Sequence, residues 1–381
     1  MKKICFFVCF IMLFSCAAVR GESGAVPEGD AKAYILIEQS TGTVLDEFNA
    51  DEQLPIASVT KVMTMLLIME EIDSGRLGYD DMVTVSDNAM SYGGSTMFLE
   101  TGEQLTVNDM LKGIAVASAN DGCVAMAEHI AGSETAFVDR MNEKAKELGM
   151  ENTHFINTNG LDDENHYSSA RDVAIMSRAL LEHPDILKYT SIWTDELRGG
   201  KFKLANTNKL IRFYTGANGL KTGSTSSALC CLSASALRDD MQLIAVVLGA
   251  PTSAKRFSSA KALLDHGFAA YKITKLAEAG EEICEAEVTN GTSRTVHGKA
   301  AEAVTSLESR AEQGEIEKRV YIDEPLEAPV NAGDTIGRMD LVKNETVIDS
   351  VDITAAEDVD KKSIFMIMRD IAGKYLTAQN Q

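Results

Sequence analysis

The sequence has few basic residues for its length and a marked excess of acidic ones. Of 381 residues, 36 are Lys or Arg and 57 are Asp or Glu, which gives a formal net charge of -21 at pH 7. Such a chain lacks the basic face that nucleic acid requires, so we expect no nucleic-acid partner. The hydrophobic fraction of 45% indicates a globular protein with one large domain and a smaller one.

Cysteine is also sparse. Only Cys123, Cys230, Cys231 and Cys284 lie beyond the first 21 residues, which is too few for a disulfide scaffold. None has metal-ligand spacing with a histidine, so we interpret all four as apolar core residues and expect no metal or cofactor. The chain contains no internal repeat and no low-complexity tract.

The N-terminus has one apolar run, but it is short. Lys2 and Lys3 precede an apolar stretch from Ile4 to about Phe14 that ends in small residues, the pattern of a secretory signal peptide over residues 1–21. The alternative is an uncleaved membrane anchor, but the run falls short of the roughly 20 residues that a spanning helix needs. We therefore expect the protein to be exported.

The C-terminus, residues 359–381, combines apolar and basic residues at helical spacing. One stripe of the expected helix carries Ile364, Ile367, Met368, Ile371 and Tyr375, and the basic residues nearby are Lys361, Lys362, Arg369 and Lys374. The pattern predicts an amphipathic helix. It could dock on its own domain, but we favour a helix that lies in a membrane interface.

Between the two ends, strands and helices alternate in blocks. Strands are expected at 33–37, 42–46, 203–205, 220–222, 228–236 and 241–248, and helices at 58–72, 107–132 with a polar interruption at 118–122, 135–148, 171–182 and 254–265. This order predicts an α+β domain over 26–271, in which helices cover an antiparallel sheet and a helical subdomain is inserted. Residues 272–358 predict a small all-β domain, although the segment 301–315 also suits a helix.

Ser58 and Lys61 form an S-x-x-K pattern, which is weak alone because Ser258 and Lys261 match it too. Context favours the first pair, because Ser58 begins an apolar helix and Lys61 returns to the same side one turn later. The helix start also offers backbone N–H groups to a developing oxyanion. The alternative is an ordinary N-cap serine.

The triplet Lys221-Thr222-Gly223 occurs once, where a strand is expected. Gly at a strand edge lets a substrate backbone pair closely, and Lys and Thr side chains can bind a carboxylate. A simple turn between two strands is the alternative.

Two serines compete as the third element of a site. Ser86-Asp87-Asn88 follows a short strand and precedes a short helix, so Ser86 is best interpreted as a surface N-cap. Ser118 and Asn120 instead interrupt a long apolar run, where polar side chains are costly unless they face a cleft. We therefore favour Ser118 over Ser86.

With these three elements in this order, the chain resembles the penicillin-recognising serine enzymes. It is most similar to the low-molecular-mass penicillin-binding proteins that act as D-alanyl-D-alanine carboxypeptidases. The stretches PIASVTKVMT, ASANDGCVAMAEHIAG, HFINTNGL and GLKTGSTSSA carry the resemblance, which covers about residues 30 to 270. It implies a β-lactamase/transpeptidase-like fold, a small C-terminal β domain and a terminal membrane anchor.

The resemblance also implies roles for the site residues. Ser58 is the expected nucleophile, Lys61 its base and Ser118 a proton relay, with Asn120 holding the substrate or orienting Lys61. The residues expected to bind the substrate are Asn120, Lys221, Thr222, Gly223, Ser224 through its backbone N–H, and Arg256. Arg256 rests on a looser match, and a surface arginine is the alternative. His166 and Asp172 are expected to hold a loop rather than to react.

The expected activity is removal of the terminal D-alanine from peptidoglycan stem pentapeptides, in cell-wall remodelling, with β-lactam antibiotics acylating the same serine. The expected place is the outer face of the bacterial cytoplasmic membrane, as a peripheral protein. A β-lactamase shares the motifs, but DDENHYSS around Glu164 lacks the Glu-x-x-x-Asn arrangement of those enzymes. A non-catalytic cell-wall scaffold would have lost the nucleophile or a lysine, and none is lost.

Overall fold

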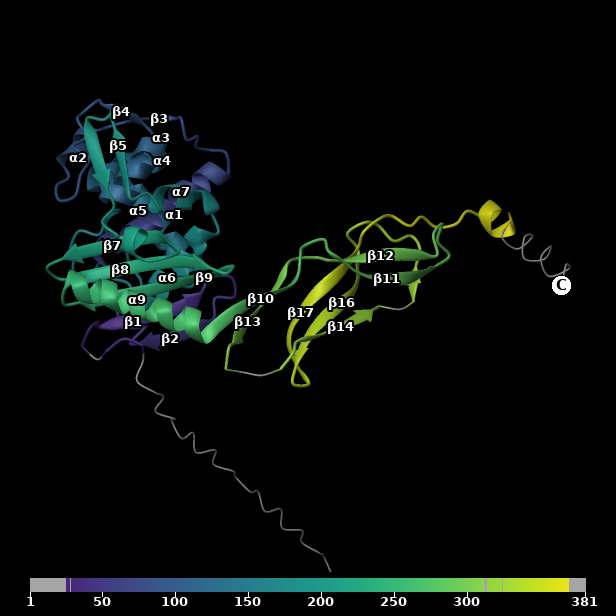
Figure 1. Ribbon diagram of the computed structural model, residues 1–381. Helices are drawn as coiled ribbons and strands as arrows, with labels where there is room; N and C mark the ends of the chain where they lie inside the picture. Colours follow the sequence, from purple (N-terminus) through teal and green to yellow (C-terminus); the bar gives the residue numbers. More distant parts are fainter. Residues whose placement is uncertain (1–24, 28, 312–313, 324, 370–381) are drawn as a thin grey trace, which may run out of the picture.

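The computed structural model describes residues 25–27, 29–311, 314–323 and 325–369. The predicted signal peptide, residues 1–21, and the last part of the predicted terminal helix, residues 370–381, lie outside these residues. Figure 1 shows a larger α/β body followed by a β-rich part that extends to one side of it.

An antiparallel sheet with strand order β2-β1-β9-β8-β7 forms the centre of the larger body. Its strands are β1 (Ala33–Glu38), β2 (Val44–Phe48), β7 (Ala217–Thr225), β8 (Leu229–Arg238) and β9 (Met241–Ala250). The early strands β1 and β2 thus share one sheet with the late strands β7, β8 and β9, through the pairing of β1 with β9. About 170 residues are inserted between β2 and β7.

Both faces of this sheet are covered, and successive side chains of β1 enter two different cores. Ala33, Ile35 and Ile37 join the core shared with α1 (Lys61–Asp73) and α6 (Ala170–Leu181). Tyr34 and Leu36 join the core under α9 (Ser253–Ala270). The period of two explains why β1 is buried along its whole length. Figure 1 shows α9 lying across the sheet.

The inserted segment is mostly helical and carries two small hairpins. Its further helices are α2 (Asp87–Ser91), α3 (Val107–Lys112), the π-helical turn η2 (Gly113–Ala117), α4 (Asn120–Ala131), α5 (Glu134–Glu147), η3 (Pro184–Ile186), α7 (Leu187–Thr190) and α8 (Leu210–Phe213). The hairpins pair β3 (Met82–Thr84) with β4 (Gln104–Thr106) and β5 (Thr194–Leu197) with β6 (Phe202–Ala205). The predicted helical subdomain is confirmed.

Three of the expected helices differ in detail from the sequence prediction. The helix expected from residue 58 begins as a 3₁₀ turn, η1 (Ala57–Thr60), before α1 continues it. The long run expected over 107–132 divides at Ser118, whose backbone is left-handed (φ 63°, ψ 35°). The helix expected to end near 265 extends to Ala270 and leads directly into β10 (Tyr271–Ala277).

The β-rich part contains a six-stranded sheet of order β14-β16-β17-β12-β11-β15 and the pair β10 and β13. Its remaining strands are β11 (Glu282–Thr289), β12 (Thr295–Ala300), β13 (Val304–Ser309), β14 (Glu317–Ile322), β15 (Leu326–Glu327), β16 (Thr335–Lys343) and β17 (Thr346–Ala355). In the ambiguous segment 301–315, pairing of β13 with β10 prevails over local helix propensity. Residues 364–369, the described part of the predicted terminal helix, are helical.

The four cysteines within the described residues are free thiols, but only two of them are core residues. Cys123 and Cys231 are buried, whereas Cys230 and Cys284 are half-buried. Cys230 and Cys231 are neighbours in β8 and point to opposite faces, and Cys230 lies nearer the strand end. The interpretation of all four as core residues is therefore wrong for two of them.

Gly160 fixes how the loop after α5 packs on the turn η1. Its φ is +85°, and a Cβ atom there would lie 1.9 Å from the carbonyl oxygen of Ala57. Only glycine allows this approach, because any side chain would collide with backbone rather than with a flexible group.

Gly160→Ala should therefore destabilise the fold by more than about 2 kcal/mol, through left-handed strain plus a backbone clash. The matched control is Gly132→Ala, because Gly132 has a similar φ of +80° with nothing within 4 Å of the added Cβ. We expect the control to cost only about 1 kcal/mol. Chemical denaturation measures both, and equal losses would contradict the packing argument.

Candidate active site

Ser58 lies in a turn that two glycines approach. Ala57, the residue before it, has a positive φ of 48°, a conformation that costs energy for a residue with a Cβ. Gly223 of β7 comes so close that a Cβ there would lie 2.7 Å from the Ile56 carbonyl oxygen and 2.9 Å from the Ser58 nitrogen. Since Gly160 contacts Ala57 from the loop after α5, the serine's backbone is held by β7 and by that loop.

Lys61 is buried and its amine has three neutral partners. Nζ lies 2.8 Å from Ser58 Oγ, 2.7 Å from Asn120 Oδ1 and 2.7 Å from the Asn159 carbonyl oxygen. Burial lowers the pKa of Lys61 from 10.5 to about 8, against the weaker opposing effects of Cys123 and Asp121. A neutral amine can donate to the two carbonyl oxygens while its lone pair accepts the Ser58 hydroxyl proton. The expected approach of Lys61 to Ser58 is confirmed.

Ser118 and Asn120 are brought into the same region by the break in the helical run. Ser118 and Asn120 are both buried. The Asn120 amide group donates from Nδ2 to the Gly93 carbonyl oxygen (2.8 Å), and this bond directs its Oδ1 toward Lys61. The backbone N–H of Asn120 donates to the Ser95 carbonyl oxygen. The polar interruption of the apolar run therefore led to Asn120, which contacts Lys61, while a catalytic role of Ser118 stays a prediction.

Ser86 lies elsewhere and has a structural role. It is the N-cap of α2, and its Oγ accepts a hydrogen bond from the Ala89 backbone N–H (3.0 Å). Its hydroxyl also donates to Glu128 at 2.5 Å. The interpretation of Ser86 as a surface cap is confirmed.

Strand β7 presents the Lys-Thr-Gly segment at the open edge of the sheet, on the side away from β8. Lys221 is buried, and its Nζ donates to the Thr222 carbonyl oxygen at 3.0 Å. Burial, reinforced by the charge of Lys61, holds the pKa of Lys221 well below its ordinary value. Ser224 follows with an exposed side chain that donates to the Leu229 carbonyl oxygen.

The Thr222 hydroxyl lies 2.6 Å from the hydroxyl of Thr207, which follows β6 and is exposed. Sequence reasoning missed Thr207, because it lies 15 residues away in the chain and has no motif of its own. It places a second hydroxyl beside the one predicted to bind substrate.

Arg256 is buried rather than a surface residue. From α9 its Nη1 donates to the carbonyl oxygens of Gly223 (3.0 Å) and Cys231 (3.2 Å), so it lies against β7 and β8. Its Nε is one of the buried polar atoms that have no hydrogen-bond partner within the described residues. Burial lowers the pKa of this guanidinium. A buried cation with an unused donor beside the strand edge is suited to an anionic ligand.

His166 is a neutral structural residue. The Ile156 N–H donates to Nδ1 (3.1 Å), so Nε2 carries the proton and donates to Thr60 Oγ1 (2.8 Å), which in turn donates to Ala57 O. Burial lowers the pKa of His166 to about 4. This chain of hydrogen bonds joins the loop to η1, which confirms the expected packing role.

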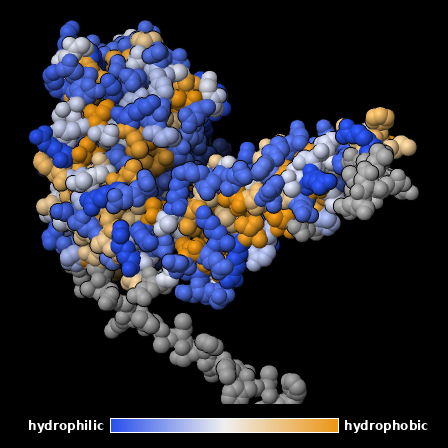
Figure 2. Space-filling model, turned by 45° about the vertical axis from the view of Figure 1, so that its right-hand side comes forward, coloured by the Kyte–Doolittle hydropathy of each residue, from blue (hydrophilic) through white to orange (hydrophobic). Residues whose placement is uncertain are grey.

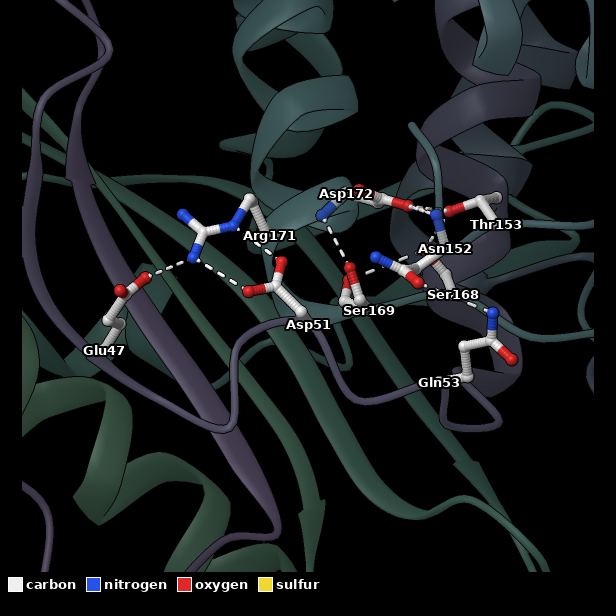
Figure 3. Close-up of polar contacts among 9 residues, drawn as sticks. All are labelled: Glu47, Asp51, Gln53, Asn152, Thr153, Ser168, Ser169, Arg171 and Asp172. Carbon is white, nitrogen blue, oxygen red and sulfur yellow. Dashed lines mark hydrogen bonds and ion pairs between the residues drawn. The ribbon is translucent and has the colours of Figure 1, made fainter. Parts of the chain in front are cut away.

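Asp172 holds the start of the same loop, as expected, but it does so through hydrogen bonds to neutral groups and not through an ion pair. Its carboxylate accepts hydrogen bonds at 2.7 Å from the Asn152 N–H and the Thr153 hydroxyl, and its own N–H donates to Ser169 (Figure 3). The cation next to it, Arg171, points the other way and binds Glu47 and Asp51 (Figure 3). The loop is therefore held by neutral donors.

A serine paired with a buried lysine, set between a helical subdomain and the edge of an antiparallel sheet, defines a penicillin-recognising serine enzyme. A family model described as D-alanyl-D-alanine carboxypeptidase matches residues 21–252, and one described as the C-terminal domain of penicillin-binding protein 5 matches residues 271–361. The chain belongs to the D-alanyl-D-alanine carboxypeptidase family.

Individual relatives agree over most of the chain, two of them over nearly its whole length. The chain is 42% identical to D-alanyl-D-alanine carboxypeptidase DacF of Bacillus subtilis over 91% of this chain and 90% of that protein. Penicillin-binding protein 5 of Haemophilus influenzae has a similar structure, with a TM-score of 0.75 at 35% identity, covering 88% of this chain and 99% of that one. Penicillin-binding protein D2 of Listeria monocytogenes, solved in an ampicillin-bound form, matches with a TM-score of 0.58 at 32% identity, over 63% and 98%.

The two competing serines allow a direct test. Ser118→Ala should nearly abolish labelling by a fluorescent penicillin, because it removes the hydroxyl expected to relay a proton during acylation, whereas Ser86→Ala should leave labelling largely intact. Ser86→Ala is expected to lower stability by about 1 kcal/mol, as loss of a helix cap does. Labelling rates and thermal unfolding of both variants check this, and strong loss of labelling in Ser86→Ala alone would reverse the assignment.

Proposed function

We propose that the protein is a serine-type carboxypeptidase that removes the terminal D-alanine from peptidoglycan stem peptides ending in D-Ala-D-Ala, through an acyl-enzyme on Ser58. The observation that supports this most is the 2.8 Å contact of Ser58 Oγ with a buried amine whose other partners are two carbonyl oxygens. Burial lowers the pKa of this amine to about 8 and so favours its neutral form, which is the form that can act as a base.

In the proposed acylation, Ser58 Oγ attacks the carbonyl carbon between the two D-alanines while its proton passes to Lys61 Nζ. The backbone N–H groups of Ser58 and Ser224 stabilise the oxyanion, because the glycine at 223 lets β7 reach the serine's backbone. When the C–N bond breaks, Ser118 relays a proton to the leaving nitrogen, and free D-alanine departs. Water then hydrolyses the ester and restores Ser58.

The terminal carboxylate of the substrate is proposed to bind beside Thr222. The hydroxyls of Thr222 and Thr207 offer donors there, and the positive charges of Lys221 and Arg256 nearby support an anionic ligand. An anchor of this kind requires a free C-terminus, so the enzyme removes one residue at a time.

A β-lactam resembles the D-Ala-D-Ala terminus to such a site and would acylate the same serine, in keeping with the ampicillin-bound form of the Listeria protein. Slow hydrolysis of that ester is proposed, because the hydrogen-bond partners of Lys61 are all neutral and Glu164 is exposed on the far part of the loop. A β-lactamase of the relevant kind needs a loop glutamate that activates water.

Purified protein should release D-alanine from a peptide ending in D-Ala-D-Ala and should label covalently with a fluorescent penicillin. Ser58→Ala should abolish both, since the nucleophile is lost, while thermal unfolding shows that the variant is folded. The label should persist after free penicillin is removed. Rapid turnover of penicillin would favour a β-lactamase, and a wild-type protein with neither reaction would favour a cell-wall scaffold.

Export and attachment to the outer face of the cytoplasmic membrane belong to the same proposal. Within the described residues no helix is long and apolar enough to cross a membrane. The helical residues 364–369 are exposed, however, with Ile364 78% and Phe365 80% accessible. Figure 2 shows apolar colours gathered at this tip of the β-rich part. Apolar side chains left uncovered beside basic residues support binding to an anionic lipid surface rather than docking on the protein's own domain.

The full chain should bind vesicles that contain phosphatidylglycerol, and the double variant Ile364→Ser/Phe365→Ser should bind them less. The matched control is Val347→Ser/Ile348→Ser, which removes two apolar side chains that are also exposed but lie in β17. Co-flotation with vesicles measures binding. Equal binding by wild type and both variants would contradict attachment through the terminal helix.

A further inference from the structure

The base Lys61 has two carbonyl acceptors, and a different loop positions each of them. The Asn159 carbonyl oxygen belongs to the loop after α5, and Asn120 Oδ1 is directed by the carbonyl oxygen of Gly93, in the loop between α2 and β4. The relative position of these loops therefore decides whether both acceptors reach the amine at once.

One carboxylate joins the two loops. Glu134 begins α5, and its Oε2 accepts a hydrogen bond from the hydroxyl of Tyr92, the residue next to Gly93. Its Oε1 accepts from the hydroxyl (3.0 Å) and the backbone N–H (3.3 Å) of Thr158, the residue next to Asn159. Glu134 thus binds the first loop at Tyr92, next to the Gly93 that orients Asn120. It binds the second loop at Thr158, next to the Asn159 whose carbonyl oxygen accepts from Lys61.

The other hydrogen bond of Thr158 does not connect its loop to the loop that contains Tyr92. The Thr158 carbonyl oxygen accepts from Thr64 of α1 (2.6 Å), which fixes the loop to the helix that carries Lys61 but not to Tyr92. Burial and the Glu134 carboxylate raise the pKa of Tyr92, so its hydroxyl stays protonated and remains a donor.

We propose that Glu134 is a positioning residue for the general base: by binding Tyr92 and Thr158 with its two oxygens, it sets the spacing between the loop that contains Asn159 and the loop that orients Asn120 toward Lys61. This inference rests on the proposed function of Ser58 and Lys61. Glu134 does not contact the reacting atoms and acts only through the two loops.

Loss of the link should change the protonation of Lys61 as well as its geometry. The ionisable groups coupled to the amine are Lys221 of β7, Cys123 and Asp121 of α4, and His166 of the loop after α5. Burial lowers the pKa of His166 to about 4, so it stays neutral over the pH range of the test. Looser loops would admit water to the amine and relieve its desolvation, which raises its pKa. A residue that merely stabilised the fold would have no such effect on titration.

The test measures the rate constant for acylation of Ser58 by a fluorescent penicillin in the full chain, from about pH 6 to about pH 10. The wild-type rate should rise with pH through about 8, as Lys61 becomes neutral. Glu134→Ala should be roughly 10- to 100-fold slower at neutral pH, with its midpoint moved to higher pH. Glu134→Gln should keep most of the rate, because its amide can accept from Thr158 and donate to the Tyr92 oxygen.

The matched control is Glu71→Gln. Glu71 is a buried carboxylate of α1 that binds Arg76 and Arg140, so its loss lowers stability without touching either loop. It should lower the melting temperature and leave the pH midpoint unchanged. A Glu134→Ala variant with the wild-type midpoint, or with a rate loss no greater than its loss of folded protein explains, would overturn the inference.

Tyr92→Phe gives a second test, which also serves if Glu134→Ala does not fold. Alone it should slow acylation and raise the midpoint, whereas added to Glu134→Ala it should change nothing more, since the two groups act through one link. Equal effects in both backgrounds, or no effect of Tyr92→Phe on wild type, would overturn the inference. A wild type that does not label at Ser58 would instead refute the proposed function, so the two failures are distinguishable.

Discussion

The removal of the Lys61 amine from water is the constraint on which the rest of this structure depends. A fully buried ammonium is costly, and the protein surrounds this one with neutral oxygens rather than a carboxylate in hydrogen-bond contact. A carboxylate there would have held the proton on the lysine. Neutral acceptors satisfy the two N–H groups of the free amine and leave its lone pair for Ser58, so burial itself generates the base.

Burial of this kind requires backbone segments to approach more closely than side chains normally permit. Gly160 and Gly223 come against the turn η1 from the loop and from β7, and the left-handed backbone of Ser118 redirects the chain between two helices. Around this core, His166 in its neutral form and Asp172 with neutral donors hold the loop without bringing a charge to Lys61. The groups in hydrogen-bond contact with the base are thus polar but uncharged.

Local patterns predicted the elements and the chain-order motifs of this site well. Strand β1, helix α1, the cap role of Ser86 and the buried position of Ser118 follow from alternation, helical spacing and the cost of polar groups in apolar runs. What escaped prediction is set by tertiary contact. The Asn159 acceptor is a backbone carbonyl, which every residue has, and Thr207 reaches Thr222 only because β6 ends beside β7.

Local sequence patterns also fail to predict the roles of charged groups and the burial of residues near strand ends, because both depend on tertiary contacts. Nothing in the sequence around Glu134 distinguishes it from other acidic residues in a first helical turn, since its role lies in which two loops happen to flank it. Cys230 and Cys284 were assigned to the core on composition alone, but a strand end and a half-covered β-sheet leave them half-buried.

Three basic side chains are buried together at the proposed site, although the chain as a whole is acidic. Lys61, Lys221 and Arg256 are all buried, burial is the first cause that lowers the pKa of each, and Lys61 and Lys221 also repel one another. Two amines so close titrate as a pair, so a proton on one disfavours a proton on the other. In the proposed binding mode, the substrate's terminal carboxylate beside Thr222 would favour the proton on Lys221, whereas its scissile amide would bring no charge to Lys61. A free C-terminus would then leave Lys61 as the neutral member of the pair, so that recognition of the substrate would also prepare the proposed base.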